Sequence, residues 1–387
     1  MDNQAVVGTN FRPDIQGLRG VAVALVILCH ASISGFTGGF IGVDMFFVIS
    51  GFVITQTLVN HRVGSIGSQL RYFYQRRILR IIPAATSVLL VTLIASYFLF
   101  HKQLPSNLLN NTQWATLFSG NFYLIHISAD YFIQGLKPAV LTHYWSLGVE
   151  EQFYVAFPLA LLALGLVKND RARKILWWSF LLAIVIGSFI YSLHQSWINP
   201  VVAYYSPFTR AWELGFGALV ALAPRFMKPV IPFFSDALVL VSVAVLIKAM
   251  LITNPASIYP GSLAWLVVAP TGAILLAGAS NRSVAVRMIG LQPLRFIGDI
   301  SYSLYLYHYI WLVIPEYFRR PQISTQARLV EIMGAVICAT VSTYLFENPI
   351  RRSARLKSDG WSTVLILLIS LSAVFVTILA LRYALHL

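Results

Sequence analysis

One arginine and one histidine near the start of the chain have a spacing that could serve chemistry. Arg19 and His30 are eleven residues apart in the sequence. On an α-helix this spacing places them about 16 Å apart along the axis and within about 20° of the same face. The pair would suit a ligand with an anionic end near the arginine and a reactive end near the histidine. The alternative is structural: an arginine that reaches toward water, and a buried histidine bonded to a backbone carbonyl.

Three carboxylates in apolar stretches form a second group of candidates. An unpaired carboxylate is unfavourable in such surroundings, so Asp44 is expected either to orient His30 or to pair with an arginine. Glu150 and Glu151 are adjacent and would point about 100° apart on a helix. We therefore expect one of them to face a polar cavity and the other to cap or pair. For each glutamate, a stabilising ion pair explains its presence as well as catalysis does.

Other polar residues lie at helical spacings within apolar segments. Arg210 and Glu213 are three apart and are predicted to form a structural ion pair. Gly51 is expected to allow the close approach of a neighbouring helix, and His308 lies within the apolar segment ISYSLYLYHY. The stretch RYFYQRRILR, together with Arg62, mixes basic residues with aromatic ones. There is no metal-ligand spacing and no P-loop, so the sequence predicts neither a metal site nor ATP-driven transport.

The elements that hold these residues must be mostly apolar. The 387-residue chain is 58% hydrophobic and 11% charged, and its mean hydropathy is +0.73. An ordinary soluble domain has about 25% charged residues, so this chain has too few to cover a globular surface. We predict an all-α, polytopic integral membrane bundle within a lipid bilayer. The net charge of +14 then reflects basic loops beside anionic lipid, and no nucleic-acid partner is expected.

Eleven segments match the length of about 20 mostly apolar residues that a spanning helix needs. Their approximate ranges are 18–35, 40–59, 81–100, 146–167, 175–193, 210–223, 232–252, 263–279, 300–318, 327–346 and 361–381.

The basic residues are distributed unevenly between the two sides of the predicted bundle. If the N-terminus is inside, 20 of the 28 lysines and arginines fall on the inner side and 8 on the outer side. This bias predicts an inner N-terminus and, after eleven spans, an outer C-terminus. The longest stretch outside the spans, about 101–145, lies on the predicted outer side and is rich in aromatic residues. It is expected to form a packed cap or a re-entrant element.

Seven motifs, in order along about 11–350, resemble those of the membrane-bound acyltransferase family 3. They are FRPDIQGLRG followed by His30, GGFIGVDMFFVISGF, RRILRIIPA, HYWSLGVEEQFY, FTRAWELGFGALVA, GDISYSLYLYH and FENPIRR. The resemblance implies an enzyme of the bacterial inner membrane that transfers an acyl group, usually acetyl. Its implied donor is cytoplasmic acetyl-coenzyme A, and its implied acceptor is a glycan hydroxyl on the far side of the membrane.

The resemblance also suggests roles for individual residues. The family's Arg-x10-His motif falls on Arg19 and His30, which implies that the histidine is catalytic. Its Arg-x-x-Arg motif, associated with donor binding, falls on Arg77 and Arg80. The expected sites are catalytic His30 with Asp44 or Glu151 holding its tautomer; donor-binding Arg19, Arg76, Arg77, Arg80 and Ser50; and acceptor-binding Trp145, Glu150 and His308.

The chain is expected to divide near residue 350. Residues 1–350 would form the acyltransferase core of about ten helices, and 351–387 a basic inner loop and one further span that leads outward. The further span resembles the family branch in which a periplasmic esterase-like domain follows. The chain is expected to be either a fragment of a longer protein or a divergent stand-alone member.

The acceptor and the class of protein each leave alternatives. An undecaprenyl-linked or other lipid-linked O-antigen sugar of lipopolysaccharide is favoured as acceptor, followed by peptidoglycan or another exported polysaccharide. The rival class is a transporter, which would also carry titratable residues along a path across the bilayer. The inner arginine cluster favours the acyltransferase, because a sugar transporter needs no phosphate-binding site.

Overall fold

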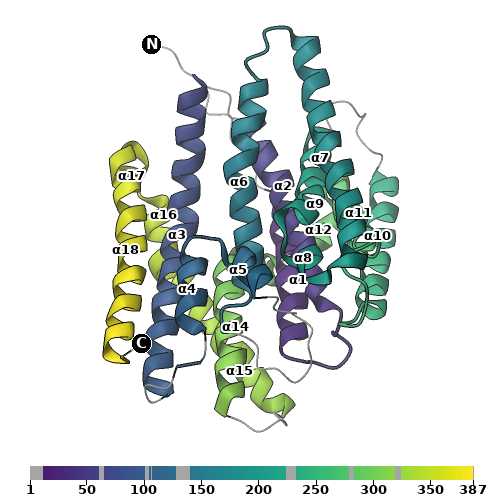
Figure 1. The fold of residues 1–387 in the computed structure, drawn as a ribbon. Coiled ribbons are helices and arrows are strands. Elements are labelled where there is room, and N and C mark those ends of the chain that lie inside the picture. Colours follow the sequence, from purple (N-terminus) through teal and green to yellow (C-terminus); the bar gives the residue numbers. More distant parts are fainter. Residues whose placement is uncertain are drawn as a thin grey trace.

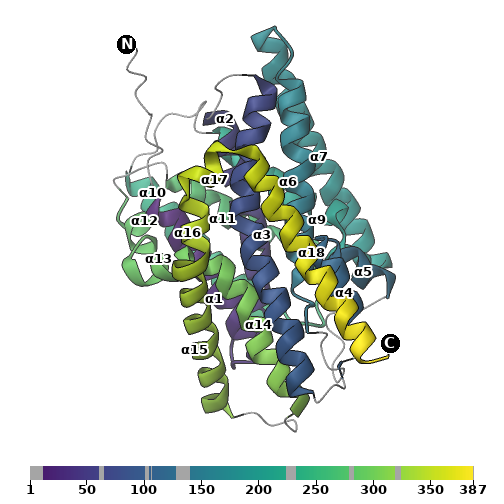
Figure 2. The ribbon, with the colours of Figure 1, turned by 90° about the vertical axis from the view of Figure 1, so that its left-hand side faces the viewer.

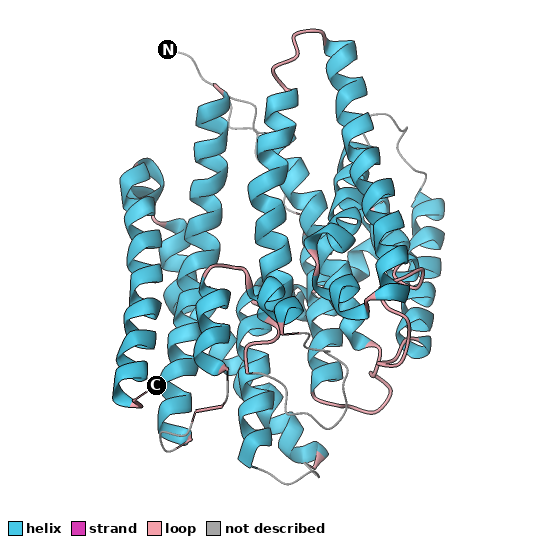
Figure 3. Cartoon of the chain, in the orientation of Figure 1, coloured by secondary structure: helices cyan, strands magenta, loops and turns pink. Residues whose placement is uncertain are grey.

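The computed structural model describes residues 12–60, 65–100, 104–105, 107–127, 140–223, 232–278, 283–318 and 324–386. All regular elements in these ranges are helical, which confirms the predicted all-α class (Figure 3). In chain order they are α1 (Pro13–His30), η1 (Gly39–Ile41), α2 (Gly42–Asn60), α3 (Ile66–Leu99), α4 (Leu108–Thr116), α5 (Gly120–His126), α6 (Tyr144–Leu164), α7 (Asp170–Ile198), α8 (Pro200–Tyr205), α9 (Pro207–Leu222), α10 (Pro232–Ile252), α11 (Trp265–Ala277), α12 (Val284–Ile289), α13 (Gln292–Asp299), α14 (Ser301–Phe318), α15 (Thr325–Val341), the π-helical η3 (Ser342–Glu347), α16 (Asn348–Arg352), α17 (Ala354–Ser358) and α18 (Gly360–Ala384).

Eight helical stretches in the described part of the chain are long and apolar enough to cross a membrane. They are α1, α2 with η1, α3, α6, α7, α10, α15 with η3 and α16, and α18. The other three predicted spans correspond to α9 and α11, which have 16 and 13 residues, and to α14, which carries five tyrosines, one histidine and one glutamate. The protein is thus a multi-pass helical bundle, while the count of eleven spans and the inner N-terminus stay predictions.

The helices pack so that the first two lie near the middle of the bundle. α1 and α2 contact each other, and α9, α11 and α14 pack around them. α18 lies along α3 at one edge of the molecule and α10 at the opposite edge (Figure 1). The view from the side shows α18 running across α3 (Figure 2). The segment after residue 350 therefore packs on the core, and the predicted division at that position stays a prediction.

The first helix ends earlier than the sequence suggested. A span over 18–35 was expected, but α1 begins at Pro13 and ends at His30. Two residues of the following turn, Ser32 and Gly35, have φ values of 53° and 86°, which lie outside the right-handed helical region. His30 is consequently the last residue of its helix rather than a mid-helix residue.

The stretch 101–145 contains two short helices, α4 and α5, that pack on each other and on α6. The ring of Trp114 stacks on that of Tyr123 at 6.1 Å between centroids, and Trp145 is buried. The described residues of this stretch are therefore packed on the bundle, and their place as an outer cap or a re-entrant element stays a prediction. The aromatic residues of this stretch at 131 and 132 lie outside them.

The crossing of α2 and α9 depends on two glycines. A Cβ at Gly51 would lie 1.9 Å from the carbonyl oxygen of Leu214, and one at Gly217 would lie 2.0 Å from that of Val48. No side chain fits at these distances, so the two backbones are in direct contact. The predicted packing role of Gly51 is confirmed.

We expect Gly51→Ala and Gly217→Ala to destabilise the bundle by about 1–3 kcal/mol each, because the added methyl group must push the two helices apart. Thermal unfolding of the detergent-solubilised protein measures this. Gly187→Ala in α7 is the matched control, because a Cβ there meets no atom within 4 Å. A Gly51→Ala protein that melts with the control would contradict the close crossing.

Candidate active site

A pocket with about 760 Å³ of empty volume lies between α1, α2, α3, α6 and α14. Arg19 of α1 and Arg77 and Arg80 of α3 line it, and Glu150 and Glu151 of α6 lie in the same wall. The two α3 arginines are three residues apart, so they share one face of that helix. Five ionisable side chains from three helices therefore meet in one cavity, with an excess of positive charge. Arg62 lies outside the described residues.

Hydrogen bonds fix the acidic side of this pocket. Glu150 Oε1 accepts hydrogen bonds from the hydroxyl groups of Ser50 and Tyr154. The guanidinium of Arg77 lies 4.3 Å from the centre of the Tyr154 ring. Glu150 therefore joins α2 to α6 and, through Tyr154, lies beside the arginines.

A second pocket adjoins the first one. Both pockets are lined by Arg19, Arg80 and Tyr302, so they meet at these residues. The other residues of the second pocket come from α1, from the end of α13 and from the η3–α16 segment: Gln16, Asp299, Thr343, Tyr344, Glu347, Asn348, Arg351 and Arg352.

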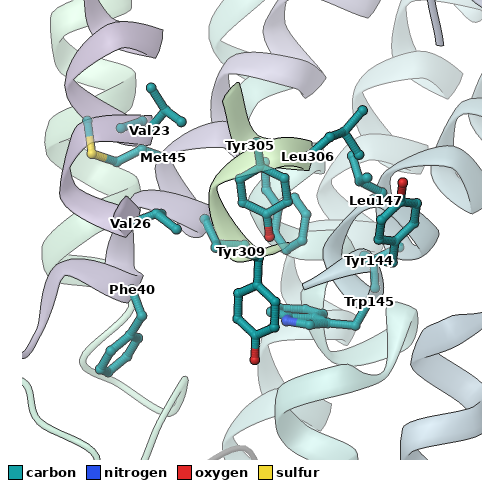
Figure 4. Packing of buried hydrophobic residues seen from close by; sticks show 14 of the residues in the cluster. Val23, Val26, Phe40, Met45, Tyr144, Trp145, Leu147, Tyr305, Leu306 and Tyr309 are labelled. Atoms are coloured by element: carbon teal, nitrogen blue, oxygen red, sulfur yellow. The ribbon is translucent and has the colours of Figure 1, made fainter. Parts of the chain in front are cut away.

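A wall of aromatic and hydroxyl side chains forms one end of the first pocket. Phe46, Ser146 and Tyr305 line the pocket there. The Ser146 and Tyr305 hydroxyl oxygens are 2.7 Å apart, and the Tyr305 ring lies 5.4 Å from the ring of His308. In Figure 4, Tyr305 lies between the residues of α1 and α2 and those of α6. One tyrosine therefore separates the arginine-lined pocket from His308.

His30 and His308 contact each other through their ring nitrogens. Nδ1 of His30 lies 2.9 Å from Nε2 of His308, and the two rings are within 7° of parallel. Nδ1 of His308 lies 2.7 Å from the carbonyl oxygen of Tyr305, one turn earlier in α14.

These contacts determine the tautomers of the two neutral rings. A carbonyl oxygen only accepts, so Nδ1 of His308 carries the proton and its Nε2 accepts. The bond between the rings then requires a proton on Nδ1 of His30. With its proton on Nδ1, the neutral His30 ring has Nε2 as its basic nitrogen.

A third histidine lies beside this pair. Nε2 of His143 donates to the carbonyl oxygen of Leu306 at 3.2 Å, and its ring stacks on Tyr309 at 4.7 Å and lies 5.7 Å from the His308 ring. Among the described residues, no group of three histidine, cysteine or acidic side chains is arranged to hold a metal ion. The three histidines thus form an aromatic cluster of ring contacts and backbone hydrogen bonds.

Asp44 pairs with an arginine, which is the second of its two predicted roles. Its carboxylate lies 2.9 Å from the guanidinium of Arg210, which lies equally close to Glu213 and donates to the carbonyl oxygen of Tyr204. The side chains of Asp44, Arg210 and Glu213 are at most 1% exposed. The predicted Arg210–Glu213 pair is therefore confirmed, and Asp44 contacts this arginine instead of His30.

Glu151 also differs from its expected position. It was expected to hold the His30 tautomer, but it lines the arginine pocket, as Glu150 does. It lies seven residues along α6 from Tyr144, which contacts the His143 ring, so about 10 Å of helix separates it from the histidines. The two glutamates therefore share one cavity, contrary to the expected division of roles. His308 occupies the place beside His30 that was expected for a carboxylate.

Two further candidates lie outside the pockets. Trp145, expected to bind the acceptor, is 1% exposed and packs its ring against Phe47 and the guanidinium of Arg210. Arg76, expected to bind the donor, is exposed and lies over the ring of Tyr72 at 4.4 Å. Neither lines either pocket, because their helices turn them away from the cavities that their neighbours line, and their assigned roles stay predictions.

Sequence reasoning missed several residues of the two pockets. Tyr154 is four residues after Glu150, and Tyr305 is three before His308, so helical spacing could have identified both. Asn348, Arg351 and Arg352 join the site from a segment more than 260 residues from the cluster at Arg77 and Arg80. No local spacing could have indicated that contact.

A protein-family model described as an acyltransferase domain matches residues 12–348. No solved structure shows significant similarity to the chain.

Named relatives agree with this match. The peptidoglycan O-acetyltransferase OatA of Listeria monocytogenes is 34% identical over 359 residues, which cover 88% of this chain and 56% of that protein. The O-acetyltransferase OatA of Staphylococcus aureus is 29% identical over 384 residues, which cover 95% of this chain and 63% of that protein. A putative O-acetyltransferase of the same species is 30% identical over 364 residues. The chain therefore spans less than two thirds of the length of these relatives.

We expect Arg210→Met to destabilise the protein by about 3–5 kcal/mol, because it leaves two buried carboxylates without their shared cation. Chemical or thermal unfolding in detergent measures the change. Arg173→Met is the matched control, because its partner Asp170 is 76% exposed and such surface pairs contribute little. If both variants unfold alike, the buried cluster does not stabilise the bundle.

Proposed function

Because the chain belongs to the membrane-bound acyltransferase family 3, we propose that it transfers an acetyl group from acetyl-coenzyme A at the inner side of the membrane to a glycan hydroxyl at the outer side. The observation that carries this proposal is that an arginine-lined pocket and a pair of histidines lie on either side of one tyrosine. An arginine-lined pocket ends at Tyr305, and behind Tyr305 lies the hydrogen-bonded His30–His308 pair. A binding site for an anionic donor and a general base are thus neighbours in one bundle.

The first pocket has the chemistry to hold the donor. Arginine binds phosphate through two parallel hydrogen bonds, and Arg19, Arg77 and Arg80 supply three such groups in one cavity. Glu150 is already bonded to Ser50 and Tyr154. The acyl-bearing end of the donor would then lie toward Phe46 and Tyr305, which lie nearest the histidines.

In this proposal His30 acts as the general base. Its Nε2 accepts the proton of the acceptor hydroxyl while the hydroxyl oxygen forms a bond to the acetyl carbon. The carbon–sulfur bond breaks, and the proton passes from His30 to the leaving thiolate, so that the products are the acetyl ester and the thiol. General-base catalysis of this kind contributes about 10²–10⁴-fold in rate.

His308 is the positioning residue of this mechanism. It accepts the hydrogen bond from Nδ1 of His30, and its own Nδ1 is held by the carbonyl oxygen of Tyr305. That arrangement keeps the lone pair of His30 on Nε2, and it supports the positive charge that develops on the ring during proton transfer. In many enzymes a carboxylate has this task; here a second imidazole occupies the place.

For the acceptor, we propose a hydroxyl group of peptidoglycan. The sequence favoured an O-antigen sugar and placed peptidoglycan second. The relative from Listeria monocytogenes carries the name of a peptidoglycan O-acetyltransferase, and this supports the second alternative better.

We expect His30→Ala to lower the rate of acetyl transfer by about 10²–10⁴-fold, because the general base is lost. His308→Phe should also lower it, because the His30 tautomer is no longer fixed. Acetyl-coenzyme A affinity should stay unchanged in both variants, as measured by equilibrium binding alongside single-turnover transfer of labelled acetyl. His194→Ala, at an exposed position of α7, is the matched control. Transfer by His30→Ala at the wild-type rate would exclude the proposed base.

For the acceptor, the chain should be expressed in a bacterium that lacks its own peptidoglycan O-acetyltransferase. Mass spectrometry of digested cell walls is expected to show muropeptides heavier by one acetyl group, and none with His30→Ala. The other surface glycans of the same cells are analysed for acetyl groups in the same way. Acetyl groups found only on those glycans would disprove the peptidoglycan assignment, and movement of a solute without any acetylation would favour the transporter.

A further inference from the structure

The second pocket has its own excess of positively charged side chains. Four arginines line it, namely Arg19, Arg80, Arg351 and Arg352, against the two carboxylates of Asp299 and Glu347. The carboxylate of Glu347 already accepts hydrogen bonds from the hydroxyl groups of Ser303 and Ser342. The cavity therefore has a positive excess that suits a ligand with more than one negative charge.

One buried polar atom of a residue that lines this pocket has no hydrogen-bond partner among the described residues. Asn348 lines the pocket and is only 8% exposed. Its amide oxygen makes no hydrogen bond to the described residues. A buried acceptor without a donor is costly. A ligand that brings an N–H group to this position would remove that cost.

An aromatic side chain completes the pocket. Tyr344 is one of the residues that line it. Aromatic rings of this kind stack on the faces of nucleobases. Multiple arginines, an unpartnered amide oxygen and an aromatic ring together match a phosphorylated nucleoside with an exocyclic amino group.

We infer that the second pocket binds the 3′-phosphoadenosine end of coenzyme A, with Arg351 and Arg352 on its 3′-phosphate, Tyr344 against the base and Asn348 accepting from the adenine amino group. The diphosphate lies at Arg19 and Arg80, which the two pockets share. This inference rests on the proposed function, because it concerns the same donor. The two pockets meet at Arg19, Arg80 and Tyr302. The slender pantetheine arm passes that junction into the first pocket, where the acyl group approaches Tyr305.

The inference divides recognition of the donor between two parts of the chain. Arg77 and the α6 glutamates line only the first pocket, and the η3–α16 segment lines only the second. Changes in η3–α16 should therefore affect ligands that carry the nucleotide and leave shorter ligands unaffected. This separation makes the inference testable.

The experiment measures equilibrium binding of coenzyme A, dephospho-coenzyme A and 4′-phosphopantetheine to the full chain in detergent. We expect the wild-type protein to bind coenzyme A about tenfold more tightly than the analogue without the 3′-phosphate, as charge-assisted bonds to arginine imply. Arg351→Gln with Arg352→Gln should abolish this preference and leave phosphopantetheine affinity unchanged. Arg355→Gln in α17 removes an exposed charge outside both pockets and should preserve the preference.

A second variant tests the same pocket without changing its charge. Asn348→Leu should weaken coenzyme A binding about threefold to tenfold, the effect of one lost hydrogen bond, and leave phosphopantetheine unaffected. If the double arginine variant folds and still prefers coenzyme A, the inference is overturned and the proposed function stands. If it does not fold, unchanged binding by Asn348→Leu overturns the inference. A wild-type protein that binds neither coenzyme A nor 4′-phosphopantetheine would overturn the proposed function itself, and the inference with it.

Discussion

The guanidinium of Arg210 connects more of this bundle than any other charged group described above. It bonds to Asp44 of α2, to Glu213 of its own helix and to the carbonyl oxygen of Tyr204, and it lies between the rings of Trp145, Tyr204 and Tyr259. In an apolar interior a charge is tolerated only when such partners surround it. The cluster lies near the glycine-mediated crossing of α2 and α9, and the two features together fix α2. That helix then presents Ser50 and Phe46 to the first pocket.

The requirement that a buried polar group has partners also distinguishes groups whose partners lie within the protein from groups that are candidates to bind a ligand. Asp44 has its cation, Glu150 has two hydroxyl donors, and His308 has both a backbone acceptor and His30. The arginines that line the two pockets outnumber the acids beside them, and the amide oxygen of Asn348 has no donor among the described residues. The two pockets are therefore the places where positive charge and a hydrogen-bond acceptor await a ligand's anionic groups and N–H donor.

Sequence reasoning predicted the helical class, the packing role of Gly51 and the Arg210–Glu213 pair, because each depends on composition or on spacing within one helix. It placed Arg19, Arg77 and Arg80 among the donor-binding residues, and all three line one cavity. It could not decide between two partners for Asp44, because that choice depends on how α2 meets α9. It assigned a carboxylate to orient His30, where the fold places His308. Contacts between distant helices carry no signature in a single sequence, and for the same reason the η3–α16 contribution was missed.

The wall formed by Tyr305 and Ser146 lies between two groups of ionisable side chains. A chain of arginines, glutamates and histidines through a bilayer would offer protons a route down their electrochemical gradient. The hydroxyl groups of Tyr305 and Ser146 are bonded to each other and buried, and the Phe46 ring packs against that of Tyr305. Ions on the arginine side consequently meet aromatic side chains before they reach the histidines. The aromatic rings of Phe46 and Tyr305 thus lie between the ionisable groups of the first pocket and the histidine pair.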